Sequence, residues 1–178
     1  GEYPDTTADG GGIPESWSQD VLAVPFNDVE RARQVIESRH NEIAAIVVEP
    51  LQRCILPQPG FFEALRSLAD QHGIVLIFDE IVTGFRLAWG GAQERWGTIP
   101  DLATYGKTTS GGYPMAAICG RADVMDTMNG WRHADDPKRI IASGTFNAYP
   151  VGAVAGLATM DEMAKPGIYD RLYEMGNR

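Results

Sequence analysis

Three polar residues directly follow apolar runs of the chain, where they could act together on a small molecule. Glu49 follows the run IAAIVV, Asp79 follows the run IVLIF, and Lys107 follows the run LATY after one glycine. In an open α/β sheet, ligands bind beyond the carboxyl ends of the strands. If these runs are strands of one parallel sheet, the sequence predicts a site that holds carboxylates and a primary amine.

Lys107 lies among glycines, in the segment YGKTTSGG. Because glycine lacks a Cβ atom, a ligand can approach the backbone closely there. A lysine in a desolvated pocket can attack a carbonyl group and form a Schiff base. The alternative is an ordinary surface lysine on a turn, and its position by itself favours neither interpretation.

Asp79 ends a buried run, where a carboxylate is costly unless a positive group faces it. A protonated pyridine nitrogen, a metal ion or a lysine would serve, and a helix cap or a structural ion pair is the alternative. The next residue, Glu80, points to the opposite side of an extended chain. We therefore expect a structural role for Glu80.

A phosphate-binding loop is the rival interpretation of the lysine. Gly106, Lys107 and Thr108 resemble the end of such a loop, and the segment IFDE resembles a Walker B strand. However, the loop requires a glycine five residues before Gly106, and Asp101 stands there. The order of the two motifs is also reversed. The P-loop ATPase interpretation is therefore rejected.

The charge balance limits the partners of this chain. Its 178 residues include 24 acidic and 15 basic residues, which gives a formal net charge of −9. Such an acidic surface argues against nucleic acid or an anionic membrane as the main partner. No apolar run approaches the roughly 20 residues that a membrane-spanning helix needs.

The cysteines and histidines suggest neither a disulfide framework nor a metal site. Cys54 and Cys119 stand far apart and form no C-x-x-C pair, which fits a reducing compartment and a cytoplasmic location. The three histidines, His40, His72 and His133, have no metal-ligand spacing, so no metal is expected.

The order of the apolar runs predicts an α/β fold with a mostly parallel central sheet and flanking helices. Strands are expected at residues 21–26, 43–48, 74–78, 102–105 and 115–119, and the second and third of these should be buried on both faces. Helices are expected at residues 28–39 after an Asp28 cap, 61–71 before Gly73, 122–128, 151–163 and 169–178. Residues 1–20 are expected to form mainly loop.

Three motifs in this order resemble the class III aminotransferases, which depend on pyridoxal 5'-phosphate (PLP). They are FDEIVTGFR with WGGAQE, PDLATYGK with GGYP, and GTF followed by Pro150. The step from Asp79 to Lys107 also fits the family. The resemblance extends from about residue 21 onward and is especially close to the glutamate-1-semialdehyde 2,1-aminomutases.

The resemblance implies roles for four residues. Lys107 would hold PLP as a Schiff base and later move the proton at the substrate carbon. Asp79 would pair with the pyridinium nitrogen, which keeps the ring an electron sink. Ile81 would lie against one face of the ring, on the same side as Asp79. Thr145 would reach the cofactor phosphate of the neighbouring subunit, which implies a homodimer.

The segment after Glu49 departs from the aminomutase pattern. The aminomutases carry V-x-G-N there, and the asparagine contacts the phenolic oxygen of the cofactor, whereas this chain reads LQRC. Gln52 is the candidate for that contact, and Glu49 is a further candidate for cofactor binding. Whether the enzyme is an aminotransferase or an aminomutase stays open.

The resemblance places residues 1–178 within the PLP-binding large domain of a fold type I transferase, incomplete at both ends. The phosphate-binding loop and the ring-stacking aromatic residue of the family would lie upstream, and the small C-terminal domain is absent. The implied reaction moves an amino group from a small amino acid or amine to a carbonyl acceptor. The alternative is a truncated chain that folds without PLP, and we expect the chain by itself to be inactive.

Overall fold

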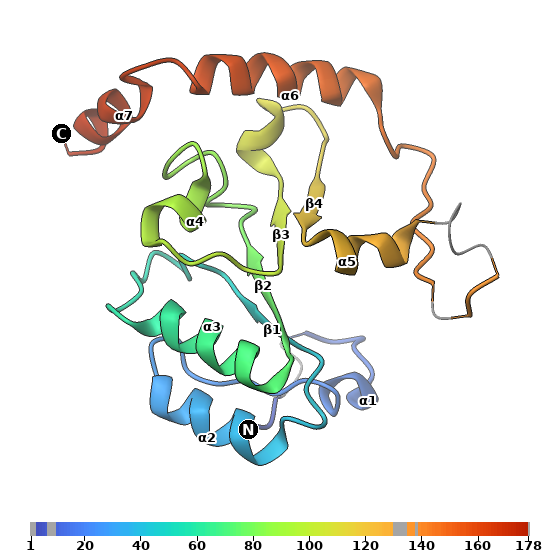
Figure 1. The fold of residues 1–178 in the computed structure, drawn as a ribbon. Helices are drawn as coiled ribbons and strands as arrows, with labels where there is room; N and C mark the ends of the chain where they lie inside the picture. Colours follow the sequence, from blue (N-terminus) through green and yellow to red (C-terminus); the bar gives the residue numbers. More distant parts are fainter. Residues whose placement is uncertain (1–2, 7–9, 130–134, 138, 178) are drawn as a thin grey trace.

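The computed structural model describes residues 3–6, 10–129, 135–137 and 139–177, and Figure 1 shows their arrangement. Of the three histidines considered above, His133 lies outside these residues. The elements along the chain are α1 (Glu15–Ser18), α2 (Val29–Arg39), β1 (Ala45–Val48), α3 (Phe61–His72), β2 (Val75–Asp79), α4 (Gly91–Trp96), β3 (Leu102–Tyr105), the 3₁₀ helix η1 (Lys107–Ser110), β4 (Ala117–Gly120), α5 (Ala122–Met125), the 3₁₀ helix η2 (Asp126–Met128), α6 (Pro150–Met163) and α7 (Ile168–Gly176).

The four strands form one sheet in the order β1-β2-β3-β4. β1, β2 and β3 are parallel, and β4 runs antiparallel to β3. The predicted mostly parallel sheet is therefore confirmed. In Figure 1 α3 lies in front of the sheet with α2 below it, and α6 runs across the top, with η1 between β3 and α6. Among the described residues, no helix has the length and apolar character that crossing a membrane requires.

The core lies between α3 and the sheet. Phe62, Leu65 and Leu68 recur at helical spacing on α3 and are nearly inaccessible to solvent, as are Leu76 and Phe78 of β2. Burying each of these side chains stabilises the fold by about 1.5–3 kcal/mol. This packing fixes β2, and therefore the residues that follow it, against a rigid helix.

Local signals set the ends of α2 and α3 where the sequence predicts them. The Asp28 carboxylate accepts a hydrogen bond of 2.9 Å from the backbone N–H of Arg31, which caps α2. Gly73 ends α3 in a left-handed conformation with φ 68°. Both helices are thereby held at the positions that pack on the sheet.

The structure corrects two predictions about strands. Residues 21–26 are not a strand, because only an isolated bridge joins Leu22 to Asp5, and Pro25 supplies no N–H for a ladder. β1 is not buried on both faces, since Val47 is 68% exposed. Ile46 and Val48 pack against the core, whereas Val47 between them points to the other face of the sheet and stays exposed.

Asp101, which directly precedes β3, ties the sheet together at the end opposite to the predicted site. Its side chain is 5% exposed and accepts hydrogen bonds from Arg66 (2.9 Å), Arg121 (2.7 Å) and the backbone N–H of Leu76 (2.7 Å). Burial raises the pKa of this carboxyl, but the N–H of Leu76 and the two guanidinium groups outweigh it. The pKa of Asp101 therefore lies below its ordinary value of 3.8.

We expect Asp101→Asn to lower the free energy of unfolding by about 2 kcal/mol at neutral pH, because Arg66 and Arg121 lose a charged acceptor. Urea unfolding measures this loss, with Asp123→Asn as the matched control. Asp123 also pairs with Arg121 but is 66% exposed, so its replacement should change little.

The Asp101 contribution should also depend on pH. A carboxyl with a lowered pKa stabilises the fold above its ordinary pKa and loses this contribution as the pH falls through the lowered value. The difference between the native protein and Asp101→Asn should therefore shrink below about pH 4. Equal losses of unfolding free energy in Asp101→Asn and Asp123→Asn would contradict the stabilising role given to the buried Asp101 carboxylate.

Candidate active site

Asp79 ends β2 with one of its carboxylate oxygens committed and the other available. Its Oδ1 accepts hydrogen bonds from the backbone N–H of Ile81 (3.0 Å) and from Oγ1 of Thr104 (3.2 Å). Thr104 is also the ladder partner of Asp79 in β3. Among the described residues, no hydrogen bond reaches Oδ2. The carboxylate is thus oriented by two donors while one oxygen can face a cationic group.

Lys107 lies just beyond the adjacent strand, as the first residue of η1. Its side chain is exposed, and within the described part of the chain its ammonium has no hydrogen-bond or ion-pair partner. Its backbone is left-handed with φ 48°, which costs a residue with a Cβ atom about 1–2 kcal/mol. Such a conformation persists only where the surroundings impose it.

Ile81 lies beside the residue that precedes Lys107. A Cβ atom added to Gly106 would stand 3.4 Å from Cγ2 of Ile81, so the two segments are in close contact. The structure therefore gathers Asp79, Ile81 and Lys107 at the carboxyl end of β2 and β3, as the strand order predicts.

α6 holds η1 in place through close backbone packing. Cβ atoms added to Gly152 and Gly156 on α6 would stand 2.9 Å from the carbonyl oxygen of Pro114 and 3.1 Å from that of Thr109. A larger residue at either glycine would push α6 away from the segment that carries Lys107. Figure 1 shows α6 crossing directly above η1.

Glu80 has the structural role that strand alternation predicts. It is completely buried, and its Oε2 accepts hydrogen bonds from Oγ1 of Thr83 (2.9 Å) and the N–H of Ala92 (2.7 Å). Its Oε1 accepts from Nε2 of Gln93 (3.0 Å), which also donates to the hydroxyl of Tyr105 (2.8 Å). These bonds attach α4 and the loop after Asp79 to the sheet.

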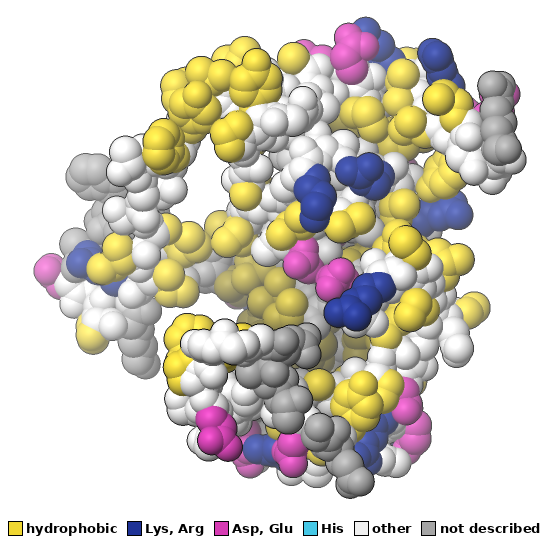
Figure 2. All heavy atoms as spheres, turned by 180° about the vertical axis from the view of Figure 1, so that it is seen from behind, with side chains coloured by type: hydrophobic (Ala, Val, Ile, Leu, Met, Phe, Trp, Pro, Cys, Tyr) yellow, Lys and Arg dark blue, Asp and Glu magenta, His cyan; other side chains and the backbone are white. Residues whose placement is uncertain are grey.

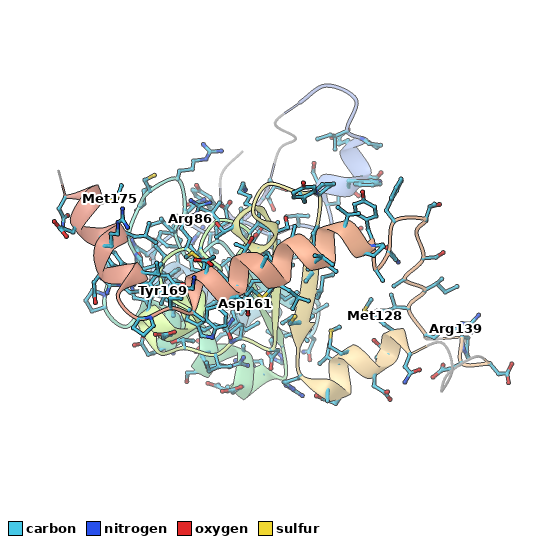
Figure 3. All side chains as sticks on the ribbon, turned by 90° about the horizontal axis from the view of Figure 1, so that it is seen from above. Arg86, Met128, Arg139, Asp161, Tyr169 and Met175 are labelled. Carbon is cyan, nitrogen blue, oxygen red and sulfur yellow. The ribbon has the colours of Figure 1, made fainter. Side chains whose placement is uncertain are left out.

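α7 reaches back to the same loop. The hydroxyl of Tyr169 donates to the carbonyl of Phe85 (3.0 Å), and that of Tyr173 donates to the carbonyl of Leu87 (2.7 Å). Seen from above (Figure 3), Tyr169 and Arg86 lie at the same end of α6. The loop between Asp79 and α4 is therefore held from two sides.

Among the described residues, the other predicted site residues make no hydrogen bond to this group, although Glu49 follows β1 at the same edge of the sheet as Asp79, since Val48 pairs with Phe78. Glu49 is exposed after β1, and Gln52 is half-buried in a turn that forms an isolated bridge with Ile55. Thr145 is exposed in the turn before α6. In the described part of the chain, no hydrogen bond links Glu49, Gln52 or Thr145 to Asp79 or Lys107.

Sequence reasoning missed Thr104, Gln93 and Tyr105. Thr104 could have been found from the register of β2 against β3, because side chains of paired residues point to the same face. The hydrogen bond between Gln93 and Tyr105 could not be predicted from the sequence, because it depends on where α4 packs.

Residues 13–178 match the aminotransferase class-III family, and the chain therefore belongs to this family of enzymes. The resemblance noted in the sequence is confirmed.

Individual relatives agree with this assignment. The chain is 40% identical over 173 residues to glutamate-1-semialdehyde 2,1-aminomutase 2 of Brevibacillus brevis, which covers 96% of this chain and 39% of that protein. An omega-transaminase from Sphaerobacter thermophilus has a similar structure, with a TM-score of 0.90 and 37% identity over 98% of this chain and 40% of its own. A transaminase with PLP bound has a TM-score of 0.85 and 26% identity, over 97% of this chain and 40% of its own.

The chain thus spans about two fifths of the length of the relatives that it matches. The predicted fold class is confirmed, and the family and the PLP-bound neighbour support PLP as the predicted cofactor. The roles of individual residues stay predictions.

We expect Tyr105 to ionise above pH 10. Burial, followed by the charge of Glu80, raises the pKa of its hydroxyl above the ordinary value of 10.0, although the bond from Gln93 acts in the opposite direction. Alkaline titration of the tyrosinate absorbance, compared between the native protein and Tyr105→Phe, isolates this group.

The raised pKa of Tyr105 also fixes the sign of its effect on stability. Neutral Tyr105 stabilises the fold below pH 10, and this contribution is lost as the pH rises above 10 through the raised value. Ionisation of Tyr105 at or below its ordinary pKa of 10.0 would contradict the description of its environment.

Proposed function

We propose that this chain carries the cofactor-anchoring part of a PLP-dependent enzyme that transfers amino groups, with Lys107 as the lysine that binds the cofactor. One observation carries the proposal. An unpartnered lysine and a carboxylate with one available oxygen stand at adjacent strand ends, in a chain of the class III aminotransferase family.

The residues at these strand ends have the chemistry that PLP requires. Lys107 offers a primary amine for the aldehyde carbon of the cofactor, and Asp79 offers a carboxylate oxygen for a protonated pyridine nitrogen. Ile81 offers an apolar side chain for a ring face. Thr104 and the N–H of Ile81 orient the Asp79 carboxylate.

When bound, PLP supplies an electron sink for the bond changes at the substrate carbon. The chain supplies the other functions. Asp79 holds a proton at the ring nitrogen, since a carboxylate favours the charged form of a nearby base. The Lys107 amine would remove and return the proton at the substrate carbon.

Three further residues complete the proposed site. Gln52 would contact the phenolic oxygen of the cofactor, Glu49 would contribute to cofactor binding, and Thr145 would reach the cofactor phosphate in a second subunit. The exposure of Thr145 is compatible with a role across a homodimer interface.

Apolar side chains around α6 support the homodimer. Val151, Val154 and Leu157 on α6 are exposed, as are Ile141 and Phe146 in the segment before it. Figure 2 shows hydrophobic side chains gathered at the top of the molecule, where α6 runs. A face of this kind is typical of a protein–protein interface.

The substrates that we propose are a small amino acid or amine and a carbonyl acceptor. Both transaminases and aminomutases occur among the relatives. A screen of amino donors should separate the two activities, because a transaminase needs a separate donor and acceptor, whereas an aminomutase moves the amino group within one substrate. A cytoplasmic location is supported by the free cysteines, Cys54 and Cys119.

The chain forms part of the PLP-binding large domain in this proposal. Because it spans about two fifths of its relatives' length, amino transfer is proposed for a protein of their full length. For the 178-residue chain by itself we expect no amino transfer.

In a protein of the relatives' full length, borohydride reduction in the presence of PLP should attach a pyridoxyl group to Lys107, and peptide mass spectrometry detects this group. Lys107→Ala should abolish this label. Lys165→Ala is the matched control, because Lys165 is exposed and paired with Glu162 (2.5 Å). A label on Lys138 or Lys165 in place of Lys107 would overturn the proposal.

Asp79→Asn should leave the labelling of Lys107 intact but lower the rate of amino transfer roughly 100-fold or more, because a neutral amide does not hold the proton at the ring nitrogen. Steady-state kinetics measure this loss. Glu37→Gln serves as the control, because the Glu37 carboxylate is exposed and pairs with Arg33 on α2. Unchanged kinetics in Asp79→Asn would exclude the role given to Asp79.

A further inference from the structure

The backbone ladder between β2 and β3 stops short of the groups that it must position. The paired residues run from Ile77 and Leu102 to Asp79 and Thr104. Lys107 lies three residues beyond the last pair, and the chain after Asp79 turns away into the loop before α4. Side-chain contacts beyond the ladder, such as that of Ile81 with Gly106, must therefore help to fix the spacing between Asp79 and Lys107.

One side-chain amide bridges the two strands at this point. Nε2 of Gln93 donates to Oε1 of Glu80 (3.0 Å) and to the hydroxyl of Tyr105 (2.8 Å). Glu80 directly follows Asp79, and Tyr105 stands two residues before Lys107. A primary amide has two N–H donors, so both are used in this bridge.

The bridge lies on the face of the sheet opposite to the Asp79 carboxylate, because successive side chains of a strand alternate. Asp79 and Thr104 bond on one face, and Glu80 and Tyr105 are joined through Gln93 on the other. The two strands are thus connected on both faces at the level of the candidate site. Gln93 can act on the site without touching cofactor or substrate.

Both ends of the bridge are rigid. Glu80 is completely buried, and within the described residues it has no ion-pair partner, so hydrogen bonds alone balance its charge. Around Tyr105, a Cβ atom added to Gly84 would stand 2.5 Å from Cδ1 of its ring. Neither end can move far to replace a lost bond, so a change at Gln93 should pass to the backbone.

We propose that Gln93 is a positioning residue that sets the distance between the Asp79 carboxylate and the Lys107 amine by joining Glu80 to Tyr105. This inference rests on the proposed function for the roles of Asp79 and Lys107. A displacement of about 1 Å in a catalytic group can cost roughly 100-fold in rate.

Two substitutions test the bridge at different points. Gln93→Met keeps the length of the side chain but removes both donors. Tyr105→Phe removes one acceptor and leaves the bond from Gln93 to Glu80 in place. Gln34→Met is the matched control, because Nε2 of Gln34 donates to an exposed glutamate, Glu30 (3.2 Å), on α2.

The first readout needs no cofactor. Competitive acetylation of the protein without PLP, followed by peptide mass spectrometry, gives the reactivity of Lys107 against pH. We expect this profile to shift in Gln93→Met and Tyr105→Phe, with Lys165 as the internal reference. The profile should be unchanged in Gln34→Met.

The second readout is the affinity for PLP, which should fall about 10- to 100-fold in both bridge variants and stay unchanged in Gln34→Met. Thermal unfolding is recorded in parallel. If Gln93→Met does not fold, Tyr105→Phe alone carries the test. Lower thermal stability with a native acetylation profile and native PLP affinity would overturn the inference, since Gln93 would then be merely structural.

Failure of the proposed function gives a different result. In that case the native protein yields no pyridoxyl label on Lys107, whatever the variants do. The acetylation profiles still report whether Gln93 positions Lys107, because they are measured without PLP.

Discussion

The parallel pairing of β2 with β3 is the constraint on which the candidate site depends. It sets Thr104 opposite Asp79 and brings the segment that carries Lys107 to the same edge of the sheet. The packing of α3 on β2 holds one face of the sheet, and the ion pairs of Asp101 hold its end opposite to the site. A shift of one residue between the strands would turn every site side chain to the wrong face.

Two adjacent carboxylates have contrasting surroundings. Glu80 has both oxygens saturated by hydrogen bonds in a site without solvent, whereas Asp79 keeps one oxygen uncommitted near the surface. Strand alternation alone sends one side chain to each face of the sheet. The same short segment can therefore serve the stability of the fold with one residue and the chemistry with the next.

Features that depend on nearby residues could be predicted from the sequence. The cap at Asp28, the helix end at Gly73 and the apolar runs of β2 and β3 all act within a few residues, and the structure has them within a residue of their predicted places. Asp79, Ile81 and Lys107 could be brought together because strand ends in a parallel sheet meet.

Features that depend on distant contacts could not be predicted. Residues 21–26 have the composition of a strand but find a partner at only one position, and the exposure of Val47 depends on what lies beside β1. α4 is six residues long and begins at a glycine, so it has no clear helical period, and Glu80 anchors it from another part of the chain. The bridge through Gln93 follows from that anchor.

The left-handed backbone at Lys107 makes this position less stable with lysine than with glycine. Glycine would adopt that conformation without strain, so the most stable residue there is not the lysine. The chain thus gives up a small part of its stability to carry a lysine at the strand end next to that of Asp79. Under the proposed function, this loss of stability would be a trade for activity.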